Sequence, residues 1–84
     1  MNDNALSFVM ASNCRQDVLL ALHQRRMTVS QLSNFLHKSP STLYRVVKGL
    51  VDKNLLEHNN ATRYRIYRIT NEGVELLKEM DVIK

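Results

Sequence analysis

Residues 28–56 constrain the fold most strongly, because they predict two short helices separated by a tight turn. A capping-box pattern of Thr28 and Gln31 begins the first helix, and Ser39 with Pro40 begins the second. Apolar residues of the second helix recur at helical spacing and predict its buried face: Leu43, Val46, Val47 and Leu50. Its other side carries polar and basic residues: Ser41, Thr42, Tyr44, Arg45 and Lys48. Such a helix packs on a core with one face and offers the other to a partner.

A β-hairpin is predicted directly after the second helix. That helix spans residues 40–53, and Asn54 suits the left-handed conformation in which helices often end. Residues 56–69 form the hairpin, with Asn59, Asn60 and Ala61 in its turn. Residues 64–69 alternate along the returning strand, although neither of its faces is purely apolar.

The flanking segments add one helix on each side. An early helix is predicted to start near Ser12 or Asn13, and Met27 then begins a very short strand. Thr70 caps a last helix, in which Gly73 permits a close contact. The buried faces are predicted to be Cys14, Val18, Leu19, Ala21 and Leu22 in the early helix, Val29, Leu32, Phe35 and Leu36 in the next, and Leu76, Leu77, Met80 and Ile83 in the last.

A chain of 84 residues is expected to make one domain, residues 1–84, with a core of residues 13–80. The elements predict a mainly α fold with a small β-hairpin (α+β) in the order α-(β)-α-α-β-β-α, a winged helix-turn-helix. The termini are candidate dimerisation segments. The apolar cluster in residues 5–10 needs a cover, either its own core or a second subunit, and the stripe of the last helix is either core or a dimer seam.

Positive charge is concentrated in the predicted helix-turn-helix and hairpin. Nine of the 12 lysines and arginines lie within residues 25–68, together with only two of the eight acidic residues. Phosphate groups contribute much of the affinity of nucleic acids for proteins, so this asymmetry favours a nucleic-acid partner. A solvated basic face without a partner is the alternative interpretation.

Other function classes find little support. The three histidines, His23, His37 and His58, lie on separate elements without a Cys or an acid at metal-ligand spacing, so no metal, cofactor or catalytic site is predicted. Cys14 is the single cysteine and cannot form an internal disulfide, which favours a reducing, cytoplasmic location. No apolar run approaches the roughly 18 residues of a membrane span. We therefore expect neither an enzyme nor a membrane protein.

Two stretches resemble winged-helix repressors of the MarR and ArsR type. The sequence SPSTLYRVVKGLVDKNLLE is similar to their recognition-helix signature, with Asn54 in place of a glycine. The matching positions are Ser39, Ser41, Thr42, Leu43, Arg45, Leu50, Leu55 and Leu56. The sequence YRITNEGVELLKEM resembles the end of the wing and the start of the C-terminal helix, so the resemblance covers about residues 13–80. It implies a transcriptional regulator that binds double-stranded DNA. From its small size we also expect a homodimer that matches a two-fold operator, and the simplest regulatory outcome is repression by occluding a promoter. No small-molecule ligand is evident, because the chain lacks the Cys pairs and His-acid clusters of metal-sensing ArsR members.

This arrangement predicts a role for each polar residue. The helix at residues 40–53 would lie in the major groove, and the hairpin at residues 56–69 would reach the minor groove or the backbone. Arg45 is the expected base contact, because its guanidinium matches the two acceptors of guanine, and Tyr44 would contact a thymine methyl or a phosphate. The remaining expected DNA-binding residues are Lys38, Ser39, Ser41, Thr42, Lys48, Arg63 and Arg65.

Several alternatives stay open at this point. Tyr44 could cover the edge of the core, Arg45 could pair with Asp52 or Glu57, and Arg68 is expected to be structural. The whole domain could serve protein contacts, although such winged helices often lose the basic residues of this face. It could also bind DNA or RNA without regard to sequence, with a steep salt dependence shared by all duplexes.

Overall fold

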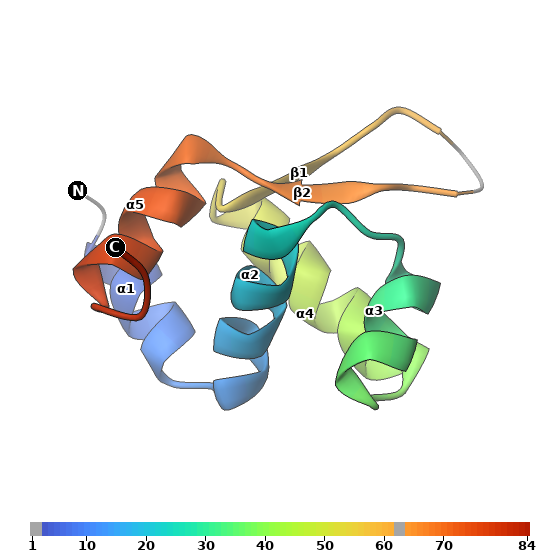
Figure 1. Cartoon of the computed structure of the whole chain (residues 1–84), viewed down its shortest axis with the longest axis horizontal. Helices are drawn as coiled ribbons and strands as arrows, with labels where there is room; N and C mark the ends of the chain where they lie inside the picture. The colour runs from blue at the N-terminus through green and yellow to red at the C-terminus, as the bar shows by residue number, and fades with distance from the viewer. Residues whose placement is uncertain (1–2, 62–63) are drawn as a thin grey trace.

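The computed structural model describes residues 3–61 and 64–84, which form five helices and an antiparallel hairpin (Figure 1). The elements are α1 (Asp3–Met10), α2 (Asn13–Gln24), α3 (Val29–Leu36), α4 (Pro40–Asp52), β1 (Leu56–His58), β2 (Tyr67–Ile69) and α5 (Asn71–Glu79). The predicted winged helix-turn-helix and its order are confirmed from α2 onward, and α1 precedes it. Helices α1 and α5 lie at one end of the molecule and α3 at the other, with the hairpin extending toward the α3 end (Figure 1).

Helices α2 to α5 each begin at a hydroxyl side chain that accepts a backbone hydrogen bond, as predicted. Thr28 accepts from the amide of Gln31 at 3.2 Å, and Gln31 Oε1 accepts from the amide of Thr28 at 2.9 Å. The other three caps follow the same spacing: Ser12 accepts from Arg15, Ser39 from Thr42 and Thr70 from Gly73. Each cap satisfies an amide that the helix itself leaves unpaired, so these starts are fixed locally by the sequence.

The turn between α3 and α4 is closed by one left-handed residue and two hydrogen bonds. His37 has a φ of 55° and ends α3. The amide of Lys38 donates to Ser33 O at 3.2 Å, and Ser33 Oγ donates to Lys38 O at 2.6 Å. Asn54 ends the turn after α4 in the same way, with a φ of 63°, as the sequence predicts.

The hairpin has a shorter returning strand than the sequence predicts. Strands β1 and β2 each contain three residues, and residues 64–66 lie outside β2. Tyr64 is 73% exposed and Ile66 is 36% exposed, so neither side chain gains enough burial to hold a strand there. Asn59 holds this part of the loop instead, because its amide donates to Ile66 O at 3.3 Å and its Oδ1 accepts from the Ile66 amide at 3.1 Å. Arg63, expected near the hairpin tip, lies outside the described residues.

The short strand expected at Met27 is a single antiparallel bridge to Tyr67. The Met27 amide donates to Tyr67 O at 3.1 Å, and the Tyr67 amide donates to Met27 O at 2.8 Å. Tyr67 is 5% exposed, and its ring meets His58 edge-on with the centroids 5.4 Å apart. The bridge therefore joins the connection between α2 and α3 to the hairpin, at the end of the β1–β2 ladder that is nearer the loop.

The predicted buried faces are largely confirmed, with one correction. Phe35 is 47% exposed, because it lies about 90° from the centre of the α3 face that Val29, Leu32 and Leu36 form. Five predicted residues are half-buried and pack against the core: Cys14, Leu36, Val46, Met80 and Ile83. Ile83 packs against the core, as predicted, but from outside the helix, because α5 ends at residue 79.

Helix α1 lies against the core of the chain itself. Ala5 is 2% exposed and Val9 is fully buried, while Met10 is 59% exposed. Phe8 packs beside Gly49 of α4, where an added Cβ would lie 3.0 Å from the ring Cζ atom. Of the two covers considered for residues 5–10, the chain's own core therefore buries Ala5 and Val9.

The start of α5 is tied to the end of α4. The Thr70 hydroxyl donates to Asn54 O at 2.8 Å, and Asn54 Nδ2 donates to Glu72 Oε1 at 2.8 Å. An added Cβ on Gly73 would lie 2.5 Å from the carbonyl oxygen of Leu55. The close contact expected at Gly73 is confirmed, and it arises because the backbone before β1 crosses the first turn of α5.

We predict that Gly73→Ala lowers the free energy of unfolding by about 1–3 kcal/mol, the usual cost of overpacking. The new methyl group would meet a backbone oxygen that cannot move aside alone. Gly49→Ala is the matched control, since its nearest neighbour is the far end of the Phe8 ring. We expect the control to stay within about 1 kcal/mol of the wild type, because alanine also favours a helix over glycine. Urea unfolding followed by circular dichroism measures both, and equal losses would contradict the proposed backbone contact.

Candidate nucleic-acid interface

Helix α4 divides into a buried and an exposed face, as predicted. The buried face consists of Leu43, Val47 and Leu50. The polar residues exposed on the opposite side, which we call the outer face of α4, are Ser41, Tyr44, Arg45, Lys48 and Asp52. Tyr44 is 58% exposed, so most of its ring is available to a partner rather than buried at the core edge.

Tyr44 lies beside the hairpin as well as on α4. Together with Arg65 and Tyr67 it lines two hollows between α4 and the hairpin, which we call the wing-side hollows. One, of about 360 Å³, continues to Lys48, and the other, of about 790 Å³, reaches Thr28 at the start of α3. Side chains predicted separately on the helix and the hairpin are therefore brought together along one edge of α4.

The other edge of α4 meets α1 and α2. A hollow of about 220 Å³ on this side, the α1-side hollow, is lined by Phe8, Arg15, Thr42, Arg45 and Val46. Arg15 Nη1 donates to Phe8 O at 2.6 Å, and its guanidinium lies 3.6 Å from the centre of the Phe8 ring. Sequence reasoning did not single out Arg15, because its position beside α4 arises from helix packing and no local pattern signals it.

The predicted residues around the turn differ in exposure and in the hydrogen bonds that their side chains already make. Ser39 Oγ accepts from the Thr42 amide, donates to Thr42 Oγ1 at 2.9 Å and lies 3.4 Å from Ser41 Oγ. Ser41 is exposed, whereas Lys38 and Thr42 are half-buried. Ser39 therefore acts as a helix cap, and Ser41 is an exposed hydroxyl beside it.

The cations on the outer face of α4 take part in no ion pair with a described residue. Among the side chains that the structure describes, the single ion pair joins Arg68 Nε to Glu57 Oε2 at 3.0 Å across the hairpin. Arg68 therefore has the structural contact that we expected. No ion pair joins Arg45 to Asp52 or to Glu57, so its guanidinium keeps its charge available to a ligand.

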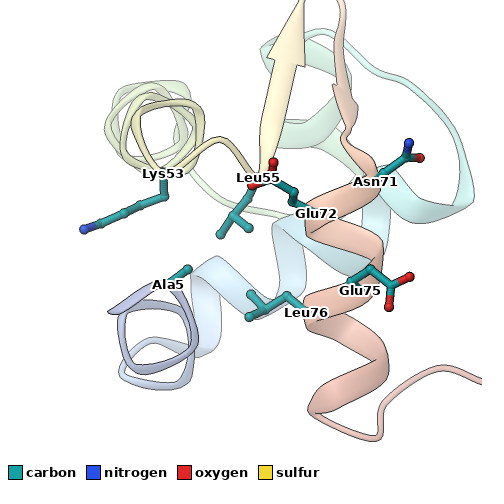
Figure 2. Close-up of a pocket in the computed structure, with 7 residues that line it drawn as sticks. All are labelled: Ala5, Lys53, Leu55, Asn71, Glu72, Glu75 and Leu76. Atoms are coloured by element: carbon teal, nitrogen blue, oxygen red, sulfur yellow. The ribbon is translucent and has the colours of Figure 1, made fainter. Parts of the chain in front are cut away.

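A separate hollow of about 530 Å³ lies between α1, the end of α4 and the start of α5 (Figure 2). Ala5, Leu55 and Leu76 form its apolar wall. Figure 2 shows the side chains of Lys53 and Glu75 pointing away from it. Specific ligand sites combine an apolar wall with polar groups that converge on the ligand, and the described side chains supply no such convergence here.

The described residues contain no group of three or more His, Cys, Asp or Glu side chains that could hold a metal ion. Among the same residues, no helix has both the length and the apolar character needed to cross a bilayer.

Comparison with known proteins identifies related domains. A family model described as "Methanogenesis regulatory protein FilR1, N-terminal domain" matches residues 3–81. Among solved structures, the transcriptional regulator HlyU from Vibrio vulnificus CMCP6 is 22% identical with a TM-score of 0.78, over 95% of this chain and 84% of that one. The adhesin competence repressor AdcR from Streptococcus pyogenes is 21% identical with a TM-score of 0.76, over 95% of this chain and 67% of that one. No curated protein matches the sequence.

A further neighbour is the C30S mutant of Lactococcus lactis ZitR in complex with DNA, which is 22% identical with a TM-score of 0.76. The match covers 84% of this chain and 51% of the ZitR chain, so this chain spans about half the length of that protein. Another ZitR structure is described as a zinc-responsive MarR family member. At these identities the comparisons establish the winged-helix fold.

We predict that Glu57→Gln changes the free energy of unfolding by less than about 1 kcal/mol, because exposed ion pairs contribute little. The Glu57 and Arg68 side chains are 50% and 56% exposed. Leu56→Ala, on the same strand but at a buried position, is the contrast and should cost about 2–5 kcal/mol. Thermal and urea unfolding measure both variants. A loss at Glu57 as large as that at Leu56 would mean that the ion pair, rather than the core contact, holds the hairpin.

Proposed function

The chain belongs to the family of the N-terminal domain of the methanogenesis regulatory protein FilR1, and we propose that it is a transcriptional regulator that binds double-stranded DNA sequence-specifically. The observation that carries this proposal is the outer face of α4. There Tyr44, Arg45 and Lys48 project from a helix that is capped and packed on the core, and no ion pair with a described residue neutralises Arg45 or Lys48. The solved complex of ZitR with DNA, in the same fold, supports it.

In this proposal α4 lies in the major groove, which is about 12 Å wide and admits a helix. Arg45 donates two hydrogen bonds to a guanine, which presents two acceptors there. Tyr44 contacts a thymine methyl or a phosphate. Lys48 and Lys38 contact phosphates as point charges, and Ser41 with the exposed start of α4 adds hydrogen bonds to the backbone.

The hairpin contacts DNA beside α4. Arg65 already lies next to Tyr44 in the wing-side hollows, so one DNA backbone could meet both residues. Arg63, which the sequence predicts near the hairpin tip, is proposed to reach the minor groove or its phosphates. Phosphate contacts fix the register of the protein on the duplex, while base contacts supply the specificity.

We further propose that the protein acts as a cytoplasmic homodimer and represses transcription by occluding a promoter. Helix-turn-helix proteins commonly bind as dimers to two half-sites, because a two-fold protein matches a two-fold operator. The sequence of the operator then carries the same symmetry as the protein.

Selection of binding sites from a random duplex library tests the proposed function directly. We expect an enriched palindrome whose half-sites are centred about 10 base pairs, or a multiple of one helical turn, apart. At about 150 mM salt the selected duplex should bind about 10³-fold or more tightly than scrambled DNA. Weak binding without enrichment would indicate architectural or RNA binding, and no binding at all would favour a protein-contact domain.

Arg45→Ala and Lys48→Ala, on the same exposed face, separate base readout from phosphate contact. Arg45→Ala should cost about 1–3 kcal/mol more on the operator than on scrambled DNA, because a guanine contact is lost. Lys48→Ala should weaken binding to both duplexes alike, because phosphates carry no sequence information. Fluorescence anisotropy titrations measure all four affinities. If Arg45→Ala weakens both duplexes equally, Arg45 is not the base contact.

A further inference from the structure

We propose that Arg15 is a DNA-backbone contact and that the α1-side hollow receives a phosphate group. This inference rests on the proposed function and deepens it. It adds a residue from α2 to an interface that otherwise comes from the α3–α4 turn, α4 and the hairpin. It also assigns a task to the edge of α4 that faces away from the hairpin.

The chemistry of the hollow suits an anion. Two guanidinium groups, of Arg15 and Arg45, and the hydroxyl of Thr42 line it, and Phe8 and Val46 complete the wall. All three polar groups can donate hydrogen bonds, and none of the described residues that line the hollow carries a carboxylate. Arginine favours phosphate, because its planar fork of donors matches two phosphate oxygens at once.

Arg15 is already held in place before any ligand binds. One N–H of its guanidinium donates to Phe8 O at 2.6 Å, and the group stacks 3.6 Å from the centre of the Phe8 ring. A guanidinium has five N–H donors, so this contact leaves others for a ligand. A side chain that is ordered beforehand loses less conformational entropy on binding than a free one.

The position of the hollow relative to α4 selects DNA as the source of the phosphate. A helix in the major groove has a sugar-phosphate backbone on each side. Arg65 lies along the edge of α4 that carries Tyr44 and Lys48, and Arg15 lies along the opposite edge beside Arg45. The two arginines therefore flank α4 as the two backbones of the groove would.

A purely structural role is the competing explanation, in which Arg15 only fastens α1 to α2. That role predicts a loss of stability when Arg15 is replaced, without a change in the charge that the protein contributes to DNA binding. The salt dependence of binding distinguishes the two. The slope of log Kobs against log salt concentration is negative, and each phosphate contact increases its magnitude by about 0.9.

The test compares full-chain variants on the selected operator and on scrambled DNA over a range of salt concentrations. Arg15→Gln should reduce the magnitude of the slope by about 0.9 per bound protomer on both duplexes, whereas Arg15→Lys should retain the slope. Phe8→Leu removes the stacking platform but keeps the charge, so it should lower the melting temperature and leave the slope near that of the wild type. Lys78→Gln, on α5, removes the same charge at an exposed position away from α4 and should leave the slope unchanged.

The outcomes separate this inference from the function on which it rests. If Arg15→Gln keeps the wild-type slope while Arg45→Ala loses sequence discrimination, the inference is wrong and the proposed function stands. A lower melting temperature with an unchanged slope in Arg15→Gln would likewise assign Arg15 a structural role only. If the wild type binds no duplex, both proposals fail. An equal loss of slope in Lys78→Gln would attribute the effect to net charge and overturn the inference.

Discussion

The paired hydrogen bonds between Met27 and Tyr67 fix the geometry on which the proposed interface depends. A two-stranded hairpin is marginally stable alone, and here β1 and β2 pair over only three residues each. The bridge supplies a third backbone partner and ties the hairpin to the connection that leads into α3. Because Tyr67 is buried at the loop end of the ladder and Arg65 comes two residues earlier, the same bridge helps to place Arg65 at the wing-side hollows, which Tyr44 also lines.

Helix α4 is restrained at both ends, which makes its outer face the rigid half of the interface. Ser39 caps its start, and the segment after its end is held through Asn54, whose carbonyl accepts from Thr70 and whose side chain donates to Glu72. Side chains on such a helix can be placed accurately against base edges, where specificity is set. Contacts from the hairpin loop to phosphates need less accurate placement, because phosphates carry no sequence information. This difference explains why the expected base contact, Arg45, comes from the helix.

Features that depend on local chemistry could be predicted from the sequence, and features that depend on packing could not. The caps at Thr28 and Ser39 and the turn at Asn54 follow from residues within one helical turn, so helix limits and the faces of α4 were predictable. The alternation before Tyr67 resembled a strand, but no core lies beneath those side chains to make it one. Arg15 was missed because its position beside Arg45 depends on how α1 and α2 pack against α4. No local sequence pattern signals that packing.

The distribution of charge constrains how the molecule can approach DNA. Basic residues occupy α4 and the hairpin, whereas α5 and the turn after it carry acidic residues: Glu72, Glu75, Glu79 and Asp81. Helix α5 lies at the opposite end of the molecule from α3 (Figure 1). A duplex that approached the α5 end would meet its own sign of charge, while one that approached the outer face of α4 would be attracted. The uneven distribution of charge therefore disfavours approach of DNA to the α5 end before any base contact forms. The long-range electrostatic field and the hydrogen-bond donors on the outer face of α4 would favour the same orientation.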